Sequence, residues 1–492
     1  MGKYEDVVNL ALRRSLFFPS NEIYANAPAG FYDFGPYGAT IRRKIVELWR
    51  KHLVQKEEFL ELDGAITMPE DVFKSSGHLT NFNDPVTQCK KCNTIHRADK
   101  LLEETTKKPY KESAPLEELT AAIKEHKVKC PKCKGDLMDV KRFNMMVKAD
   151  IGVSTKAPCY LRPETCQTIF VDWLRMIRTM RVTLPQGVSQ AGKSFRNEIS
   201  PRQTLLRQVE FSQMETEVFF DPTQINEIDR WEEVKDYPLR IMKANSDKTE
   251  YITAEKLAKD KTVSGKIIAY YLARTQQLFE KYGIPVDKMR FRQLDDKERA
   301  FYAKEGWDFE VETSLGWVEL VANNYRTDYD LKGHMEGSKT DLQFTTPEGR
   351  KFIPHIWEIS IGIDRTFYVA LEMAYKQQDD RIWLSLPSSL APIHAGIFPL
   401  LANKPELTAK AKEIFEELRD CYEVMYDQTG SIGKRYARLD EVGVPWCITI
   451  DFDSLTNNDV TIRARDSAQQ KRIKTSELRD TLYQLITGKM HI

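Results

Sequence analysis

Residues 194–220 constrain the fold more than any other part of the chain, because they alternate like two consecutive strands joined by a polar loop at 200–208. Side chains at every second position of a strand share one face, so Arg196 and Glu198 point the same way before the loop. The matching set after the loop is Val209, Phe211, Gln213 and Glu215. The pattern predicts an antiparallel hairpin with an arginine, carboxylates and an aromatic ring on one surface, which is either a binding site or a solvated sheet face.

A competing interpretation of this region is a phosphate-binding loop, because Gly187 to Ser194 fits the pattern G-x-x-x-x-G-K-[ST]. Such a loop needs a helix directly after it, whose first backbone N–H groups bind phosphate. Here the chain after Ser194 alternates like a strand and meets Pro201. The flanking sequence therefore argues against this interpretation, which predicts nucleotide hydrolysis without any amino-acid requirement.

Length and composition indicate a soluble multidomain protein. The 492 residues correspond to roughly three domains, and the formal net charge is zero. A nucleic-acid partner must then be bound by local basic patches, since the protein has no overall positive field. No apolar run approaches the ~18 residues of a membrane span, and Glu5, Asp6, Arg13 and Arg14 are incompatible with a secretory signal. We expect a cytoplasmic protein with no membrane partner.

The distribution of periodic segments predicts two domains of class α+β and α/β. Residues 1–387 combine strand-like runs with amphipathic helices, which predicts an antiparallel sheet flanked by helices. Two stretches change character and are interpreted as insertions, at about 81–145 and at about 221–305, the second being charged and mainly helical. After a proline-containing boundary, strands and helices alternate over 388–492, which predicts a separate α/β domain.

Four cysteines form two C-x-x-C pairs within the first insertion. Cys89 and Cys92 are separated by 37 residues from Cys130 and Cys133, and the second pair is followed by a glycine. Two such pairs predict a tetrahedral Cys₄ site for structural Zn²⁺ in a zinc ribbon. The alternative is a subdomain that folds without metal and keeps free thiols.

The hairpin and two further segments together resemble a known family. Phe195 to Glu198, with Arg202 and Arg207 in the following loop, resembles motif 2 of the class II aminoacyl-tRNA synthetases. Glu358 to Arg365 is similar to motif 3 of that family. The helix expected at 37–56 and the strand expected at 59–68, closed by a proline, resemble motif 1, which implies a homodimer formed through motif 1.

Within the class, the chain resembles the homodimeric glycyl-tRNA synthetase family. The strings that carry this resemblance are Ser75-Ser76-Gly77-His78, Arg97-Ala98-Asp99, Leu161-Arg162-Pro163-Glu164-Thr165 and Gly430 to Tyr436. The sequence departs from the family pattern at Ile359, where many relatives have proline. Two alternatives remain, which are a synthetase-like binding protein without catalysis and a class II synthetase for another small amino acid.

The resemblance implies a glycine–tRNA ligase that uses ATP to form glycyl-adenylate and pyrophosphate and then transfers glycine to the 3′ end of tRNA(Gly). Arg196 and Arg365 are the implied catalytic residues, Arg196 at the α-phosphate and Arg365 over the adenine face opposite Phe211. The residues implied to bind ATP are Arg196, Asn197, Glu198, Leu206, Arg207, Phe211, Glu319, Leu320, Gly362 and Arg365.

The resemblance also implies a glycine pocket and a magnesium site. The residues implied to bind glycine are Arg97, Glu164, Phe211, Glu215, Glu358 and Ser360. Mg²⁺ on the ATP phosphates is assigned to Glu319 and Glu358. Because one methyl group contributes only ~1–3 kcal/mol of binding, the pocket must reject alanine sterically.

Residues 388–492 resemble the anticodon-binding domain of class II synthetases. The implied contacts with tRNA are Lys434, Arg435 and Arg438 on one expected helix. Further candidates are the pair Arg463 and Arg465, which share a strand face, and the aromatic residues Tyr436 and Trp446. For any one of these residues, a solvated basic face is the alternative.

Overall fold

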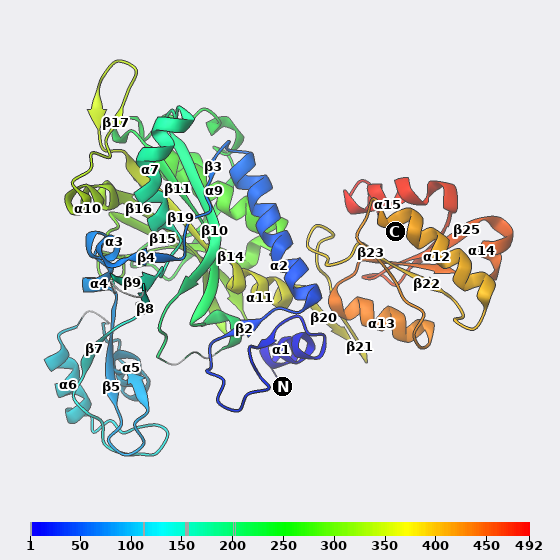
Figure 1. Cartoon of the computed structure of the whole chain (residues 1–492), viewed down its shortest axis with the longest axis horizontal. Helices are drawn as coiled ribbons and strands as arrows, with labels where there is room; N and C mark the ends of the chain where they lie inside the picture. The colour runs from blue at the N-terminus through cyan, green and yellow to red at the C-terminus, as the bar shows by residue number, and fades with distance from the viewer. Residues whose placement is uncertain (1, 112–113, 153–156, 200, 202) are drawn as a thin grey trace.

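A computed structural model describes residues 2–111, 114–152, 157–199, 201 and 203–492. The chain forms a large body, from which a small subdomain projects, and a separate C-terminal domain (Figure 1). Arg202, expected in the motif 2 loop, lies outside the described residues. Among the described residues, no helix combines the length and the apolar character that a membrane crossing needs.

A nine-stranded sheet forms the centre of the large body. In spatial order its strands are β13 (Thr249–Thr253), β12 (Pro238–Met242), β14 (Met289–Gln293), β15 (Glu305–Thr313), β16 (Gly316–Thr327), β19 (His355–Gly362), β11 (Glu210–Phe220), β10 (Gln186–Phe195) and β3 (Leu60–Glu61). Only the pairs β12–β14 and β10–β3 are parallel, and all the other neighbours are antiparallel. This is the antiparallel sheet predicted from the alternating segments.

One face of the sheet is largely apolar and carries the main core. The helices packed there are α1 (Lys3–Arg13), α2 (Pro36–Trp49) with its π-helical continuation η1 (Arg50–Gln55), α9 (Lys266–Lys281) and α11 (Ile363–Ala374). Ile41, Ile45 and Trp49 recur every four residues on α2 and are all fully buried. Gly38 is required there, because a Cβ atom would lie 1.7 Å from the Leu16 carbonyl oxygen.

The opposite face divides into an apolar end and a polar end. On β11, Phe219 stacks on Trp173 of α7 (Cys166–Met180) with ring centroids 3.9 Å apart, and α10 (Tyr329–Ser338) packs beside α7. Two and four residues earlier on the same face lie Glu217 and Glu215. The alternation of β11 thus produces a sheet surface that is covered at one end and carries polar groups at the other.

Two predicted elements differ from the structure. The strand expected at 59–68 is split into β3 and β4 (Thr67–Pro69), because the chain leaves the sheet edge at Gly64 to join β9 (Ala157–Leu161). Residues 221–305 are not mainly helical, since β12, β13 and β14 extend the central sheet there.

The smaller elements are β1 (Phe18–Pro19), β2 (Tyr32–Asp33), α3 (Glu70–Ser75), α4 (His78–Asn81), β8 (Val147–Ile151), α8 (Ala254–Lys259), β17 (Phe344–Thr345), β18 (Lys351–Phe352) and the 3₁₀ turns Thr204–Leu206, Pro222–Gln224, Trp231–Glu233, Val286–Lys288 and Thr475–Glu477.

The projecting subdomain has a core of its own. Its elements are β5 (Asn83–Gln88), β6 (Ile95–Arg97), α5 (Ala98–Thr106), α6 (Leu116–Glu125) and β7 (Lys141–Asn144). Leu102 and Leu119 of the two helices are fully buried in this separate cluster. The subdomain is connected to the body by Phe82 and Met145, whose backbones are hydrogen-bonded at 3.1 Å.

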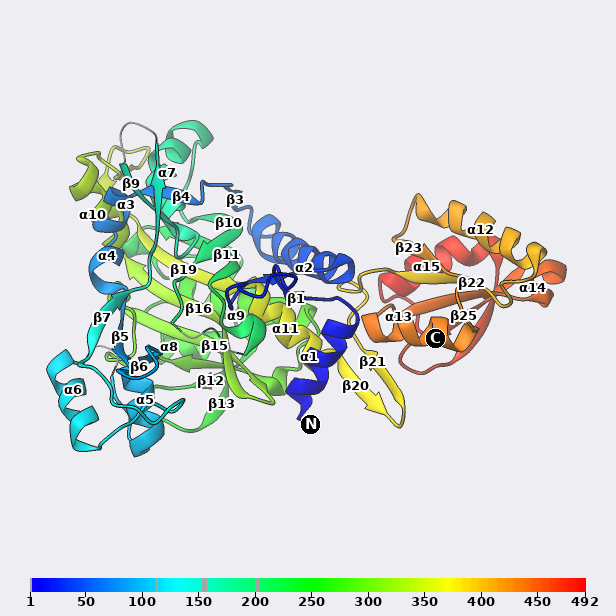
Figure 2. The same ribbon diagram turned by 60° about the horizontal axis from the view of Figure 1, so that its bottom comes forward.

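The C-terminal domain is a mixed sheet covered by helices, as Figure 2 shows. Its strands, in spatial order, are β23 (Val424–Tyr426), β22 (Ala395–Pro399), β24 (Trp446–Ile450), β25 (Asp459–Ala464) and β26 (Gln470–Lys474). Its helices are α12 (Pro405–Arg419), α13 (Ile432–Val442), α14 (Phe452–Asn457) and α15 (Leu478–Ile486). The hairpin of β20 (Tyr375–Gln378) and β21 (Arg381–Leu384) leads into it. Lys44 of α2 donates to the Ala391 carbonyl at 2.6 Å and ties the two domains together.

Candidate active site

A cavity of about 590 Å³ opens on the polar end of the central sheet. Five parts of the chain line it: the hairpin β10–β11 with its connecting loop, the first half of β16, the end of β19, the start of α11 and the base of the projecting subdomain. The predicted site residues on its wall are Arg97, Arg196, Glu198, Leu206, Arg207, Phe211, Glu319, Leu320, Ser360, Gly362 and Arg365. The remaining predicted residues, Asn197, Glu164, Glu215 and Glu358, do not line this cavity.

The hairpin is a regular antiparallel pair, with Ser194 opposite Phe211 and Gln190 opposite Glu215. The sequence Gly187 to Ser194 lies within β10 and no helix follows it directly, so it is not a phosphate-binding loop. Gly192 is needed for a different reason, since a Cβ atom would lie 2.3 Å from the guanidinium of Arg162.

The side chain of Arg196 lies between two aromatic rings. Its guanidinium carbon is 5.4 Å from the ring centre of Phe211 and 5.3 Å from that of Phe82, and its Nε donates to the Pro163 carbonyl at 3.2 Å. The next backbone N–H, of Asn197, donates to Met145 at 2.8 Å. The base of the subdomain is therefore part of the arginine's environment, and Phe82 is a wall residue that sequence reasoning missed.

Arg207 and Arg365, two further predicted arginines, bind acceptors of the protein itself. Arg207 forms an ion pair with Glu198 at 2.6 Å. Arg365 donates to the carbonyls of Leu206 and Glu319 at 3.1 and 3.0 Å, which holds it across the cavity mouth. Both guanidinium groups are more than a third exposed, so an anionic ligand in the cavity can compete for them.

A ladder of charges crosses β14, β15 and β16 beside Glu319. Arg292 pairs with Asp308 at 2.8 Å and Arg290 pairs with Glu310 at 2.7 Å, on strand positions directly opposite one another. Burial, and next the nearby charge of Glu319, raise the pKa of Asp308 to about 8. A divalent cation beside Glu319 would relieve this repulsion, which makes Asp308 a candidate magnesium ligand that sequence reasoning missed.

Glu358 is remote from this ladder. It lies opposite Asn324 of β16. Asn324 is five residues from Glu319 on that strand, which corresponds to about 16 Å. The Glu358 carboxylate is 2 % exposed and accepts from Arg326 at 2.8 Å and from Asn324 at 2.6 Å. A single magnesium ion shared by Glu319 and Glu358 is therefore incompatible with the structure, and the prediction is corrected in that respect.

Three predicted glycine carboxylates lie buried beneath the cavity floor at Ser360. Glu215 accepts from Thr165 at 2.5 Å and from the Ser360 hydroxyl, and Glu164 lies 3.2 Å from His78. Burial and then the charge of Glu164 raise the pKa of Glu215. Burial also opposes ionisation of Glu164, but His78 and Arg326 bring its pKa well below the usual value.

Arg326 is the cation at the centre of this carboxylate cluster. It is fully buried, bonds Asp330 at 2.7 and 2.8 Å and Glu358 at 2.8 Å, and lies 3.8 Å from Glu164. Glu217, on the same sheet face, has no hydrogen-bond partner for either carboxylate oxygen among the described residues. Burial, and next the charge of Glu358, raise its pKa well above the usual value. Carboxyl groups thus outnumber cationic side chains here, which favours a ligand cation.

Some of the site residues that sequence reasoning missed are indicated by a pattern in the sequence, and others are not. Arg290 and Arg292 on one strand and Asp308 and Glu310 on the next each occur at alternate positions, a pattern that indicates a charged sheet face. Asp364, which accepts from Arg42 at 2.7 Å and from the Ser212 backbone at 2.8 Å, had no such signal, because its partners are distant in sequence.

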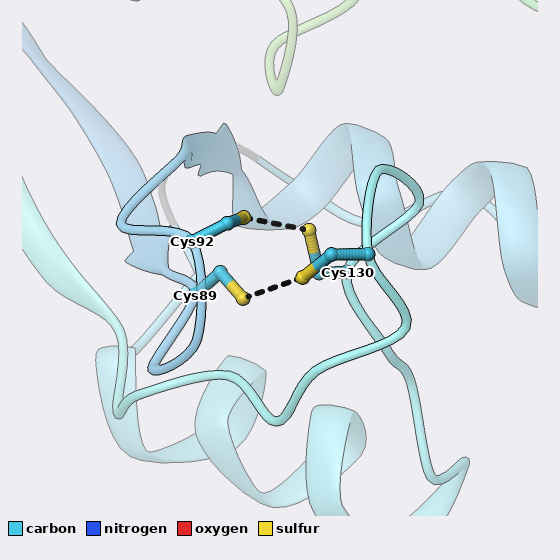
Figure 3. Close-up of side chains that lie close together, drawn as sticks. Cys89, Cys92 and Cys130 are labelled. Atoms are coloured by element: carbon cyan, nitrogen blue, oxygen red, sulfur yellow. Dashed lines mark hydrogen bonds between the residues drawn. The ribbon is translucent and has the colours of Figure 1, made fainter.

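The four cysteines of the C-x-x-C pairs lie together in the subdomain. Figure 3 shows the sulfur atoms of Cys89, Cys92 and Cys130 directed toward one small region. The Sγ atoms of all four lie within 4.8 Å of one another, with Cys89–Cys133 at 3.5 Å and Cys92–Cys130 at 3.7 Å. Tetrahedral Zn–S bonds of ~2.3 Å require sulfur separations of about 3.8 Å, so this geometry fits zinc.

In the C-terminal domain, several predicted tRNA contacts are buried. Arg435 is 1 % exposed and donates to the carbonyls of Leu400 and Gly430, so it holds a loop instead of facing solvent. Arg463 and Arg465 are likewise buried, Arg463 in a bidentate pair with Asp440. Trp446 is buried, and the Tyr436 hydroxyl is hydrogen-bonded to Thr449 at 2.6 Å.

On α13, Lys434 and Arg438 remain at the surface. Lys434 is exposed, and Arg438 is a third exposed while paired with Asp427. Of the three predicted contacts on this helix, only these two side chains are accessible to solvent.

Comparisons with known proteins identify the fold and the family. Residues 394–485 match the family model described as anticodon binding domain. A prolyl-tRNA synthetase of Giardia lamblia, solved with prolyl-adenylate, superposes with a TM-score of 0.63 over 99 % of this chain and 80 % of its own, at 15 % identity. This likeness shows the class II synthetase fold.

Sequence relatives extend over the whole chain. The glycine–tRNA ligase of Methanothrix thermoacetophila is 36 % identical, with 100 % of this chain and 98 % of the relative covered. Those of Thermococcus sibiricus and Pyrococcus furiosus are each 38 % identical, with 99 % of both chains covered. Identity at this level over full length, together with the class II fold and the anticodon-binding domain, shows that the chain belongs to the glycine–tRNA ligase family.

Proposed function

We propose that this chain activates glycine with ATP, forming glycyl-adenylate and pyrophosphate, and then esterifies the 3′ end of tRNA(Gly). One observation carries the proposal: a cavity with four arginines on its wall ends on a floor beneath which Glu164, Glu215 and Glu358 lie buried. The arginines suit a triphosphate, and the carboxylates suit an ammonium group. Ser360, on the floor, lies between the two sets of groups.

The residues around the cavity suggest how the reaction is promoted. The glycine carboxylate is already an anion, so no general base is needed and catalysis depends on position and charge stabilisation. Arg196 donates to the α-phosphate oxygens and stabilises their charge, while Phe211 stacks on adenine. Arg207 reaches the terminal phosphate and exchanges its ion pair with Glu198 for that contact. Arg365 covers the adenine from the other side.

Selection of glycine follows from steric exclusion. A strand face crowded with Gln213, Ser360 and the carboxylates leaves an ammonium site whose walls are less than 10 % exposed. Alanine gains no apolar contact in such a site and its methyl group meets polar atoms. To admit the methyl group, the buried polar groups would have to move aside and lose hydrogen bonds. The free-energy cost of that loss exceeds the binding free energy that one methyl group contributes.

We expect the pH dependence of glycine binding to report this cluster. Burial raises the pKa of Glu358 to about 8, Arg326 opposes the rise, and Glu164 and Glu215 add to it. Below about pH 8 the carboxyl is neutral and attracts the ammonium group weakly, whereas above it the group is charged. The KM for glycine in adenylate formation should therefore fall as pH rises from about 7 to about 8.5, by up to tenfold per unit. A KM for glycine that is constant over this range, or that rises, contradicts the assignment.

Magnesium is proposed at Glu319 with Asp308 as its neighbour. When bound, the ion neutralises charge on the ATP phosphates, and Glu319 and Asp308 supply the oxygen ligands that it prefers. Asp308→Asn removes one negative ligand and should raise the Mg²⁺ concentration for half-maximal adenylate formation by about tenfold or more. Glu312→Gln, at a more exposed position on the same strand, should leave that concentration unchanged. Equal effects of the two variants would contradict the site.

Zinc is proposed at Cys89, Cys92, Cys130 and Cys133 as a structural ion. The purified chain should contain about one zinc per molecule by atomic emission, and Cys130→Ser should lose it and unfold the subdomain, because metal binding supplies much of a small domain's folding energy. Cys421→Ser, at an exposed position in the other domain, should keep the metal. A metal-free preparation with a folded subdomain contradicts the site.

Two further partners are proposed from surface features. The segment after β3 carries exposed Ala65 and Ile66 at the free edge of the central sheet, which supports a homodimer through motif 1. Lys434 and Arg438 on α13 support contact with the tRNA backbone near the anticodon. Sedimentation of the free chain tests the dimer.

Charging of tRNA tests the proposed function as a whole. With ATP, Mg²⁺ and tRNA, labelled glycine should become acid-precipitable, and tRNA oxidised by periodate should stay unlabelled because its terminal ribose hydroxyls are destroyed. Labelling by another amino acid in place of glycine, or labelling without ATP, would contradict the proposal.

A further inference from the structure

A fully buried glutamine lies between the sheet edge and the glycine carboxylates. Gln190 of β10 is 0 % exposed and lies directly opposite Glu215 in the strand register. Its amide nitrogen donates to the Thr165 carbonyl at 2.5 Å and to the Thr168 hydroxyl at 2.8 Å. Its amide oxygen accepts from the backbone N–H of Gly64 at 2.5 Å. Both ends of the amide are therefore used, and the side chain has one orientation that satisfies all three partners.

The partners belong to two segments, the start of α7, which holds Thr165 and Thr168, and the chain just beyond β3, which holds Gly64. Thr165 donates its hydroxyl to Glu215 at 2.5 Å, so the turn that Gln190 holds also holds that carboxylate. Gly64 lies just beyond β3, and its carbonyl accepts from Arg162 at 3.1 Å. The hydrogen bonds thus run without interruption from the exposed segment 63–66, through Gln190 and Thr165, to Glu215.

Gly64 shows how closely this arrangement is packed. A Cβ atom there would lie 2.7 Å from the Gln190 amide oxygen and 2.7 Å from the Thr168 side chain. Neither neighbour can move freely, because Gln190 is buried and Thr168 is 6 % exposed on α7. A displacement of segment 63–66 would therefore also move the amide of Gln190.

We propose that Gln190 is a positioning residue for glycine: it fixes the turn at Thr165, and so the Glu215 carboxylate, in relation to segment 63–66 at the sheet edge. Gln190 does not line the cavity and contacts no substrate itself. The proposal rests on the proposed function, because it concerns the affinity of the same pocket for the glycine ammonium group. It also implies that contacts made by segment 63–66 alter glycine affinity while leaving the ATP wall of the cavity unchanged.

The test compares variants in glycine-dependent exchange of labelled pyrophosphate into ATP, with glycine and ATP each varied. Gln190→Met keeps the length of the side chain and removes all three hydrogen bonds. Gly64→Ala leaves Gln190 in place but pushes its amide. Thr165→Val removes the hydroxyl that reaches Glu215. Ser189→Ala is the matched control, because Ser189 is the neighbouring buried residue of β10 and its hydroxyl bonds Thr216 on the opposite face of the sheet.

The expected result is a KM for glycine raised about tenfold in the first three variants, with the KM for ATP changed by less than about twofold. Ser189→Ala should leave both values unchanged. The double variant Gln190→Met with Thr165→Val should be no worse than the more impaired single variant, since both break one chain of contacts. A KM for glycine that stays unchanged, or equal increases for both substrates, overturns the proposal.

Thermal melting and sedimentation of each variant separate positioning from loss of structure. If Gln190→Met fails to fold, Gly64→Ala and Thr165→Val carry the test, and unchanged glycine KM values in both overturn the proposal. Failure of the proposed function gives a different result, because the unmodified chain would then show no exchange with glycine at all.

Discussion

Replacing Arg196 by alanine should reduce the rate of adenylate formation by ~10²–10³-fold, because the variant loses a donor that stabilises transition-state charge. The guanidinium is held between Phe82 and Phe211 and bonded to the Pro163 carbonyl, so it is oriented before substrate arrives. Arg196→Lys should recover little of the activity, since an ammonium group lacks the planar fork that binds two phosphate oxygens. Pyrophosphate exchange at saturating glycine and ATP measures the effect.

The control for this variant is Arg175→Ala. Arg175 lies on the exposed side of α7, and its removal should leave the exchange rate and the melting temperature unchanged. Arg196→Ala should also keep the parental melting temperature, since its side chain is only half-buried on a cavity wall. Near-normal exchange by Arg196→Ala would contradict the proposed α-phosphate role.

The second large effect is on stability and concerns Arg326. Replacing it by methionine leaves Glu164, Glu358 and Asp330 buried without their cation, and loss of one partner from a buried ion pair costs ~3–5 kcal/mol. Although burial by itself disfavours its charge, Asp330 and then Glu358 hold the pKa of Arg326 well above the usual value. The melting temperature of the N-terminal body should therefore fall steeply, and more at high pH, where more carboxylates are charged.

Arg419→Met is the matched comparison for the Arg326 variant. Arg419 pairs with Glu416 on α12, but the two side chains are 53 % and 64 % exposed, and surface pairs of this kind contribute ~0–1 kcal/mol. Differential scanning calorimetry of the two variants separates the outcomes. Similar small shifts for both would contradict the role of Arg326 as the cation that stabilises the buried carboxylates.

The parts of the fold that sequence reasoning predicted well are those with strong local patterns. The hairpin expected at 194–220 is present, and β11 occupies its second half, but β10 lies earlier than expected and ends at Phe195, so Arg196 and Glu198 belong to the connecting loop. Helix α2 repeats Ile41, Ile45 and Trp49 at helical spacing, and the C-terminal domain alternates strands and helices as expected. In each case a period within one segment determined the element.

The parts that could not be predicted depend on contacts between distant segments. Strands β12, β13 and β14 are short, and they join the central sheet only because β14 pairs with β15, β12 pairs with β14 and β13 pairs with β12. Gly64 leaves the sheet edge because Gln190 and Arg162, more than 90 residues later, bind its backbone. The local sequence carries no sign of these partners.

The resemblance identified the side chains of the site, but it did not indicate which of them are buried. Arg435 and Arg463 belong to recognisable basic strings, yet both are buried, because carbonyl groups and Asp440 accept from them. The distance between Glu319 and Glu358 was equally hidden, since it depends on the register of β16 against β19. Charge in a sequence indicates an interaction, whereas its partner is decided by packing.

Exchange of labelled pyrophosphate into ATP, measured with each of the twenty amino acids in turn, tests glycine activation by this cavity most directly. The reaction requires only ATP, Mg²⁺ and an amino acid, so it examines the cavity and the carboxylates beneath it without any contribution from tRNA. We expect exchange with glycine and none above background with alanine or serine. Exchange with a different amino acid, or no exchange with glycine under conditions where the chain is folded, would contradict glycine activation at this site.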